Sequence, residues 1–255
     1  MSKRNTPQRR HSILALLTEQ GDVSVDDMAK RFETSEVTIR KDLAALEAEG
    51  RLLRRYGGAV TVPPELMGDN GQPVSRFKQA IARAAASRIA ENARIIVDCG
   101  STTAALIPQL GKQPGLVVMT NSLHVASALS ELEHEPVLLM TGGTWDPHSE
   151  SFQGRVAEQV LRSYDFDQLF IGADGIDLDR GTTTFNELLG LSQVMAEVAR
   201  EVVVMVEADK VGRKIPNLEL PWSRIHTLIT DDRLPIEARE QIQARGITLI
   251  CAAVC

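Results

Sequence analysis

The sequence contains few aromatic residues and few cysteines, and it has no long hydrophobic run. Aromatic residues make up 4% of the 255 residues, and the longest unbroken aliphatic stretch, 202–206, has five residues. A membrane-spanning helix needs about 20 apolar residues, so we expect no membrane span. The basic N-terminus is not followed by the apolar segment of a signal peptide, and we therefore expect a cytoplasmic protein.

The three cysteines form an odd, unpatterned set, which argues against a disulfide framework. The zinc motifs C-x-x-C and H-E-x-x-H are absent, so we expect no structural metal. The glycine patterns G-x-G-x-x-G and G-x-x-x-x-G-K-[ST] are absent too, so we expect neither a dinucleotide nor a nucleoside triphosphate, and no other cofactor. Apolar residues make up 43% of the chain, enough to bury a core.

The charge of the chain is unevenly distributed. The net charge of −6 argues against binding to nucleic acid when it is taken as a whole. Residues 1–58, however, hold 11 basic against 9 acidic side chains, and 59–255 hold 17 against 25. A segment rich in proline and glycine separates the two parts. We predict a DNA-binding domain at 1–60, a linker at 61–75 and an α/β domain at 76–255.

Three helices are predicted in the first 50 residues. The first covers 6–20, the second opens at the capping residue Ser24, and the third runs from Ser35 to about residue 49, with Gly50 as its end. The third helix has an apolar stripe of Ile39, Leu43 and Leu46. Two short helices, a tight turn and a third amphipathic helix are typical of a helix-turn-helix unit.

A basic segment follows the third helix. In RLLRRYGGAV (51–60), Gly57-Gly58 favours a hairpin turn, and Arg51, Arg54 and Arg55 add positive charge. The pattern is that of a winged helix-turn-helix, in which hydroxyl, Arg and Lys side chains contact phosphates or base edges. A three-helix bundle with charged faces is the alternative interpretation.

Helical and strand patterns alternate from residue 76 onward, which predicts a mostly parallel α/β sheet. The predicted strands are 94–99, 116–120, 136–141, 168–173, 202–208, 225–230 and 247–251. The predicted helices are 76–93, 102–110, 122–133, 155–164, 187–200 and 235–245. Ligands bind at the carboxyl ends of such strands, so the residues that follow each strand are the candidate site.

Small polar residues follow three of these strands. They are Gly100, Ser101, Thr102 and Thr103 after the first strand, Asn121 and Ser122 after the second, and Gly142 and Gly143 after the third. Hydroxyls and free backbone N–H groups at a helix start suit an anion such as phosphate. The alternative is that these residues are plain helix caps and turns.

Acidic and amide residues follow a later strand. GADGID (172–177) contains Asp174, and TTTFNE (182–187) ends in Asn186 and Glu187. Such groups can accept hydrogen bonds from sugar hydroxyls or act as a general base. Lys210, beyond the strand at 202–208, can supply a cation for phosphate. An Asp-rich turn is the alternative.

The strings SEVTIRKDLAALEAEG (35–50) and RLLRRYGGAV (51–60) resemble the N-terminal signature of the DeoR family of bacterial sugar-operon regulators. The resemblance implies DNA contacts by Thr38, Arg40, Lys41, Arg54 and Arg55, and the hydroxyl of Ser35 at the start of the third helix is expected to contact a phosphate. The strand exits of 76–255 are similar to those of the family's effector domain, which resembles ribose-5-phosphate isomerase in fold and binds a phosphorylated sugar.

The resemblance also implies the effector site and the function. The effector residues are Asp98, Gly100, Ser101, Thr102, Thr103, Asn121, Ser122, Gly142, Gly143, Asp174, Asn186, Glu187 and Lys210. The family string D-x-S-K-[FY] reads here E-A-D-K-V, with Asp209 in place of the serine. TNSLHVASALSEL (120–132) and GRKIPN (212–217) are most similar to family members that respond to a sugar alcohol, which implies a hexitol 6-phosphate.

We therefore expect a transcriptional repressor and not an enzyme. Its predicted partners are double-stranded operator DNA, a phosphorylated sugar or sugar alcohol, and further copies of the chain in a dimer or tetramer. Two alternatives stay open. One is a sugar-phosphate isomerase with Asp174 or Glu187 as base, and the other is a constitutive DNA-binding protein whose second domain only oligomerises.

Overall fold

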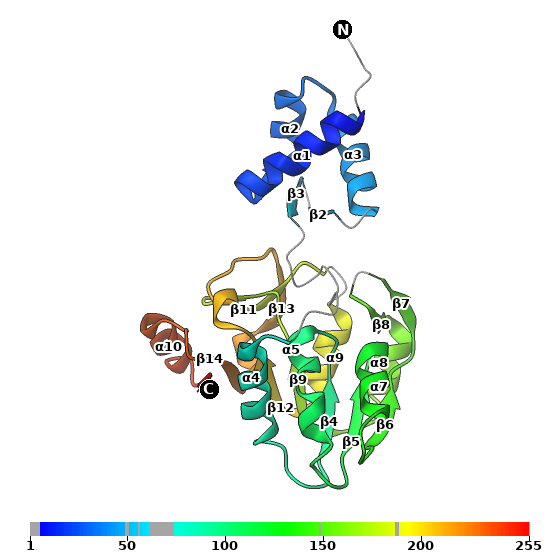
Figure 1. The fold of residues 1–255 in the computed structure, drawn as a ribbon, viewed down its shortest axis with the longest axis vertical. Helices are drawn as coiled ribbons and strands as arrows, with labels where there is room; N and C mark the ends of the chain where they lie inside the picture. The colour runs from blue at the N-terminus through cyan, green and yellow to red at the C-terminus, as the bar shows by residue number, and fades with distance from the viewer. Residues whose placement is uncertain are drawn as a thin grey trace. The chain divides into compact units, whose positions relative to one another are not determined.

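The computed structural model describes residues 6–48, 51–55, 57–61, 74–147, 149–186 and 189–254. The chain divides into two compact units, Met1–Gly71 and Gln72–Cys255 (Figure 1). Most of the predicted linker, 61–75, lies outside the described residues, so the predicted domain limits stay a prediction. No helix among the described residues is long and apolar enough to cross a membrane.

The N-terminal unit is a winged helix-turn-helix, as predicted. Its elements are α1 (Thr6–Gln20), β1 (Asp22–Ser24), α2 (Val25–Arg31), α3 (Glu36–Ala48), β2 (Leu52–Arg55) and β3 (Gly58–Thr61). Ile39, Leu43 and Leu46 are buried with residues of α1 and α2, which confirms the predicted stripe. β1 was not predicted from the sequence; it pairs antiparallel with β3 and makes the wing three-stranded. The predicted helix end at Gly50 lies outside the described residues.

Side-chain caps begin two of these helices. The Ser24 hydroxyl accepts a hydrogen bond from the Asp27 N–H at 3.0 Å and donates one to the Asp27 carboxylate at 2.6 Å. The Ser35 hydroxyl accepts from the Thr38 N–H at 3.2 Å. Each cap satisfies a backbone N–H that has no partner within its helix, which fixes where α2 and α3 begin.

The larger unit is built on a seven-stranded sheet in which every neighbouring pair is parallel, in the order β15-β14-β12-β9-β4-β5-β6. The strands are β4 (Arg94–Val97), β5 (Val117–Thr120), β6 (Val137–Met140), β9 (Phe166–Ile171), β12 (Ala199–Met205), β14 (Thr227–Asp231) and β15 (Thr248–Ala252). These are the seven predicted strands. The fold class predicted from the sequence is confirmed.

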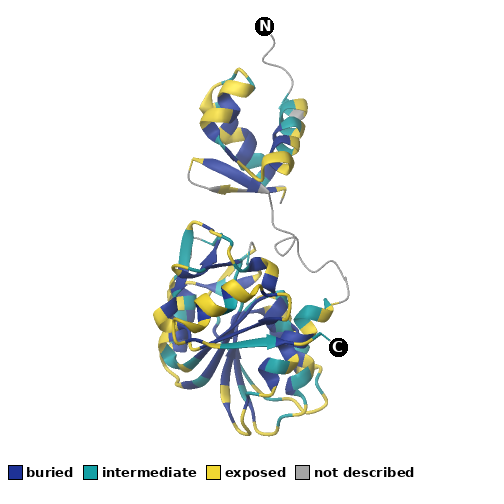
Figure 2. Ribbon diagram, turned by 90° about the vertical axis from the view of Figure 1, so that its left-hand side faces the viewer, coloured by how far each residue is buried: buried dark blue, intermediate teal, exposed yellow. Residues whose placement is uncertain are grey.

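Helices cover both faces of this sheet. They are α4 (Arg76–Ala86), α5 (Ser101–Ala104), α6 (Ile107–Leu110), α7 (Leu123–Ser130), α8 (Arg155–Leu161), α9 (Gly190–Val198) and α10 (Ile236–Gln243). The first four pack in one core with Ile95 and Val97, and the last three pack in a second core with Ile96. Alternate residues of one strand therefore enter opposite cores, and the central strands are buried (Figure 2).

Two small antiparallel sheets were not predicted. One is the hairpin of β7 (Thr144–Asp146) and β8 (Ser151–Gln153), and the other joins β10 (Gly175–Asp177), β11 (Gly181–Thr184) and β13 (Asn217–Pro221). Gly181 has a φ of +134°, and a Cβ there would lie 2.1 Å from the Leu220 carbonyl oxygen. Only glycine permits this approach of β11 to β13, so the small sheet depends on it.

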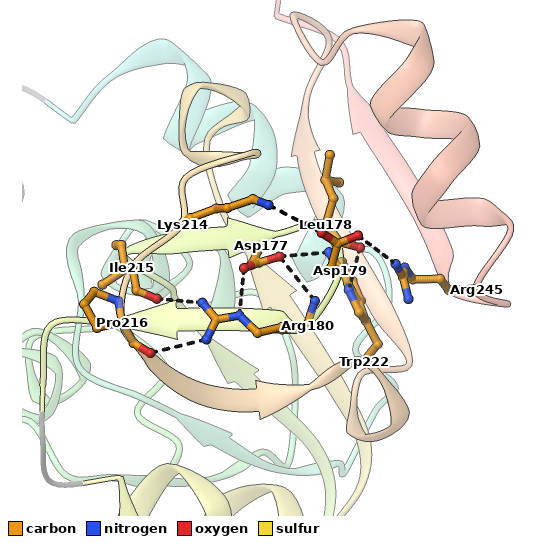
Figure 3. A network of polar contacts seen from close by, with 9 residues as sticks. All are labelled: Asp177, Leu178, Asp179, Arg180, Lys214, Ile215, Pro216, Trp222 and Arg245. Atoms are coloured by element: carbon orange, nitrogen blue, oxygen red, sulfur yellow. Dashed lines mark hydrogen bonds and ion pairs between the residues drawn. The ribbon is translucent and has the colours of Figure 1, made fainter.

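A polar network holds this small sheet in place (Figure 3). Arg180 donates from Nε to the Asp177 carboxylate at 2.7 Å and from Nη2 to the Ile215 carbonyl at 2.8 Å. Burial raises the pKa of Asp177, but the hydrogen bonds from Arg180 and from the Asp179 N–H outweigh it and leave this pKa lowered. The network fixes the turn between β10 and β11 against the segment that leads into β13.

Candidate DNA-binding surface and effector site

The exposed side of α3 carries the predicted DNA contacts. Ser35, Arg40 and Lys41 are exposed, and Thr38 is half-buried. Val37 is 59% exposed and was not predicted as part of this surface. An exposed apolar side chain one turn before the cations Arg40 and Lys41 suits contact with a thymine methyl group, whereas the cations suit phosphates and guanine edges.

Two of the predicted cations form ion pairs within the N-terminal unit. Arg40 lies 2.7 Å from the Glu36 carboxylate, and Arg54 lies 2.7 Å from that of Glu47. Neither ion pair was predicted from the sequence. Exposed pairs of this kind are worth about 0–1 kcal/mol, so a phosphate can replace the carboxylate at little cost. The side chain of Arg55 is not among those that the structure describes.

A buried acid ties α3 to α1. The Asp42 carboxylate is 3% exposed and accepts hydrogen bonds from Arg9 Nε at 2.6 Å and Arg10 Nε at 3.1 Å. Because α1 and α3 meet through these charges, the cluster fixes how the predicted recognition helix lies in its unit. This cluster was not predicted, because charged partners about 30 residues apart leave no local pattern in the sequence.

The candidate effector site lies where the strand order of the large sheet reverses. From β4 the chain continues to β5 and β6 on one side, whereas β9, β12, β14 and β15 lie on the other. Asp98 follows β4 and Asp174 follows β9, so both lie at the carboxyl ends of the two strands that flank this switch point. Ligands of open parallel sheets bind at that position.

Asp98 is held in a buried hydrogen-bonded cluster. Burial raises its pKa to about 6, although hydrogen bonds from the Cys99 N–H and the Asn121 side chain oppose the shift. The Asn121 Oδ1 also accepts a hydrogen bond from the Cys99 N–H at 3.1 Å. Asn121 thus fixes the segment after β4 that contains Asp98 and Cys99.

The loop after β4 differs from the sequence prediction in one respect. The predicted helix at 102–110 is divided into α5 and α6, so a single turn follows Gly100, and its dipole supplies little positive charge. A cation is nevertheless present, because Lys78 Nζ of α4 donates to the Ser101 hydroxyl at 2.8 Å. Lys78 was not predicted.

The predicted residue Thr103 uses its hydroxyl within the loop. It is fully buried, and its hydroxyl donates to the carbonyls of Asp98 and Gly100 at 2.9 and 2.8 Å.

The exits of β5 and β6 are tightly built. The Ser122 hydroxyl caps α7 by accepting from the Val125 N–H at 3.4 Å, which is the role of a plain helix cap. Gly142 and Gly143 have φ values of +59° and +114°. A Cβ on Gly143 would lie 2.6 Å from a backbone carbonyl, whereas one on Gly142 would meet nothing within 4 Å. Gly142 therefore leaves open space beside the strand exit.

The exit of β9 carries an acid and a buried cation. The Asp174 Oδ2 accepts from the Thr184 hydroxyl at 2.7 Å and from the Phe185 N–H at 3.1 Å. Lys210, in the 3-10 turn η2 (Ala208–Lys210), is 6% exposed and donates to the Ala173 carbonyl at 3.1 Å. Lys210 thus contacts the loop after β9 that also carries Asp174.

The remaining predicted residues of this region contribute less. The Asn186 N–H donates to the Thr184 hydroxyl at 3.0 Å, and Glu187 lies outside the described residues. Asp209, which replaces the family serine, lies 3.1 Å from the Arg213 guanidinium and is half exposed. Its carboxylate is thus engaged by Arg213.

Glu219 of β13 joins this site and was not predicted. It is 9% exposed, and its Oε1 accepts from the Ser192 hydroxyl of α9 at 2.9 Å. Burial, together with the negative charges of Asp98 and Asp174, raises its pKa to about 8. A single acid within the string NLELP gives no recognisable sequence signal. Among the described residues, no group of three or more His, Cys, Asp or Glu side chains is arranged to hold a metal ion.

A winged helix-turn-helix unit followed by a parallel α/β unit with a polar site at its switch point defines a two-part regulator of transcription. A model of the DeoR-like helix-turn-helix domain matches residues 9–65, and one of the DeoR C terminal sensor domain matches residues 74–232. The chain belongs to the DeoR family of transcriptional regulators.

Relatives and solved structures of similar sequence and fold were also found. A putative aga operon transcriptional repressor of Escherichia coli O157:H7 is 38% identical over 96% of this chain and 93% of that protein. The HTH-type transcriptional regulator GlpR of Haloferax volcanii is 31% identical over 95% and 96%. Ribose 5-phosphate isomerase A of Methanocaldococcus jannaschii has a TM-score of 0.39 at 20% identity, covering 52% of this chain and 53% of that one.

Proposed function

We propose that this protein is a repressor of a sugar or sugar-alcohol catabolic operon whose affinity for operator DNA is controlled by a phosphorylated sugar. Family membership supports the regulator, and one observation supports the ligand. At the switch point, Asp98, Asp174, Lys210 and the Ser101–Lys78 pair come from four separate parts of the chain to one edge of the sheet. Carboxylates suit sugar hydroxyls, and lysines suit a phosphate.

The DNA would be bound by α3 and the wing. In this proposal Ser35, Thr38, Arg40 and Lys41 contact phosphates and base edges in the major groove, and Arg54 and Arg55 of β2 contact the backbone beside it. One small unit makes few contacts, so we propose that a dimer or tetramer binds paired half-sites in double-stranded DNA. Such a regulator works beside the chromosome, which places it in the cytoplasm.

The effector would lie across the carboxyl ends of β4 and β9. Its phosphate is placed beside Ser101, Thr102 and Lys78, where a hydroxyl and an ammonium already meet at 2.8 Å. Its hydroxyls are placed beside the polar groups of the other strand exits. Those groups are Asp98, Asn121, Asp174, Asn186, Glu187 and Lys210, and the open space beside Gly142 admits the ligand.

The proposed effector is a hexitol 6-phosphate, with glucitol 6-phosphate first. This assignment is supported by the similarity of TNSLHVASALSEL and GRKIPN to family members that respond to a sugar alcohol. The ligand would favour an arrangement of subunits in which the DNA-binding units no longer match the operator. It can shift that equilibrium only by its difference in affinity between the two arrangements.

An isomerase and a constitutive DNA-binding protein, the two alternative functions, explain fewer features of the structure. An isomerase that used Asp174 as base would leave the winged unit without a role, and one oxygen of Asp174 already accepts two hydrogen bonds. A constitutive DNA-binding protein would leave the buried acids and lysine of the switch point without a role.

A mobility-shift titration tests the proposal. The full chain is mixed with labelled DNA from upstream of its own operon, with and without glucitol 6-phosphate. We expect sequence-preferring, salt-sensitive binding that the sugar phosphate changes at least about tenfold, a coupling of about 1.4 kcal/mol. Binding that no member of a sugar-phosphate panel alters supports the constitutive alternative, and turnover of a sugar phosphate supports the isomerase.

A further inference from the structure

Glu219 is a buried acid to which the proposed function assigns no role. It lies within β13, where neighbouring Leu220 pairs with Thr182 of β11. Thr182 pairs with Leu220 and Thr183 with Leu218, so Glu219 is the unpaired residue of a bulge in β13. Glutamate is almost never fully buried in a protein unless it is paired, and bulges often re-aim a side chain next to a site.

The carboxyl group of Glu219 is only half satisfied. Oε1 accepts the hydrogen bond from Ser192 of α9, at 2.9 Å. Oε2 is inaccessible to solvent and has no partner within hydrogen-bond geometry among the residues that the structure describes, although the nearby Thr182 hydroxyl lowers the pKa of the carboxyl group. A buried polar atom without a partner costs about 1–3 kcal/mol, so such atoms are rare and point to a group that is absent from the structure.

The position of this free oxygen connects it to the effector site. Asp98, after β4, and Asp174, after β9, both act electrostatically on Glu219, and Glu219 acts in turn on the Cys99 thiol. The two other elements that pack against Glu219 present uncharged hydroxyls, those of Ser192 on α9 and Thr182 on β11. Glu219, on the small sheet, therefore lies within electrostatic range of Asp98 and Asp174 at the switch point.

We propose that Glu219 is a specificity-determining residue of the effector site and that its Oε2 binds a hydroxyl group of a polyhydroxy ligand. The inference rests on the proposed function, because it assigns a further contact to the same ligand. It adds the small antiparallel sheet to the site and makes one end of the ligand an uncharged, hydroxyl-bearing group.

The protonation of Glu219 favours a hydroxyl over an ammonium group. Burial and the nearby Asp98 and Asp174 raise the pKa of Glu219 to about 8, so this carboxyl group is mostly uncharged near pH 7. A neutral carboxyl group can donate one hydrogen bond and still accept others, and a hydroxyl does the same. An ammonium group only donates, and it would bind the ionised form instead.

The test compares Glu219→Gln and Glu219→Leu with the full-length wild type and with the control Glu237→Gln, at an exposed acid on α10. Binding of glucitol 6-phosphate, glucose 6-phosphate and glucosamine 6-phosphate is measured by calorimetry at pH 6.5, 7.5 and 8.5. The ratio of wild-type to E219Q affinity cancels the titration of the ligand's own phosphate.

We expect E219Q, which keeps a neutral donor and acceptor, to bind the responding polyol phosphate within about threefold of the wild type at pH 6.5. E219L is expected to lose about tenfold or more, which is the loss of one buried hydrogen bond. Raising the pH to 8.5 is expected to weaken the wild type several-fold relative to E219Q, because the carboxyl group loses its proton. E237Q is expected to match the wild type throughout.

Three results would overturn the inference. Wild-type affinity for E219L and a pH-independent ratio for E219Q, with a wild type that binds, would remove Glu219 from the site and leave the proposed function intact. A large loss in E219Q, together with affinity for glucosamine 6-phosphate that rises with pH, would show an ammonium partner. Failure of the wild type to bind any of the three would refute the effector function, and this inference with it. If E219L does not fold, the pH profile of E219Q alone decides.

Discussion

Replacing Glu219 with glutamine is expected to change how the stability of the larger unit depends on pH. Glutamate in an unfolded chain has a pKa near 4.3, whereas burial raises the pKa of Glu219 to about 8 in the fold. Between these values the folded protein holds a proton that the unfolded chain has lost. The stability of the wild type therefore falls as the pH rises through this window, and E219Q lacks this contribution.

The size of the effect follows from the two pKa values. Each pH unit within the window costs about 1.4 kcal/mol, so Glu219 alone lowers the free energy of unfolding by about 2.5 kcal/mol between pH 5 and pH 7. Burial also raises the pKa of Asp98, to about 6, and Asp98 adds a slope of the same sign. Asp98 is present in both proteins, so the difference between their pH profiles reports the loss of Glu219 together with its coupling to Asp98.

Urea unfolding of the full chain, followed by tryptophan fluorescence, measures this difference. Both tryptophans, Trp145 and Trp222, belong to the larger unit, and Trp222 is buried, so the signal reports on that unit. We expect E219Q to gain on the wild type by about 2–3 kcal/mol between pH 5 and pH 7. Parallel pH profiles would refute the reasoning, because Glu219 would then be ionised in the fold.

Three further variants test other parts of the structure. Lys78→Gln is expected to weaken sugar-phosphate binding about tenfold in calorimetry while ligand-free operator binding stays unchanged, and a loss of both would contradict a role confined to the effector. Asp42→Asn, which leaves two arginines without their buried partner, is expected to destabilise the N-terminal unit by about 2–3 kcal/mol in circular-dichroism melts, and an unchanged melt would count against it. Lys41→Ala is expected to weaken operator binding and reduce its salt slope by about one in fluorescence anisotropy, whereas the control Lys30→Ala, on an exposed cation of α2, should do neither.

Most of the fold could be predicted from the sequence, because its elements are encoded locally. Each strand of the parallel sheet is a short apolar run bounded by polar or glycine residues. The capping residues Ser24 and Ser35 indicate where α2 and α3 begin. The small sheet of β10, β11 and β13 could not be predicted, because its strands have three to five residues and none of them is a continuous apolar run. It depends on a close backbone contact between Gly181 and Leu220, which are distant in sequence.

The candidate site could be predicted in part for the same reason. Parallel strands bring their carboxyl ends to one edge, so strand exits pointed to Asp98 and Asp174. Lys78 and Glu219 were missed, because they come from α4 and β13 and carry no motif. Conversely, the sequence does not show whether a hydroxyl that follows a strand is available to a ligand. Thr103 uses its hydroxyl within the loop, and this follows only from the three-dimensional structure.

The most direct test of the account is the anisotropy of a labelled upstream DNA fragment titrated with the full chain, without and with glucitol 6-phosphate, for the wild type and for Asp98→Asn. The sugar phosphate is expected to shift the wild-type affinity for DNA about tenfold or more. D98N, altered at the switch point of the sheet, is expected to bind the same DNA with unchanged affinity but to respond less to the ligand. Equal DNA affinity with and without every sugar phosphate tried would contradict control of DNA binding by this site.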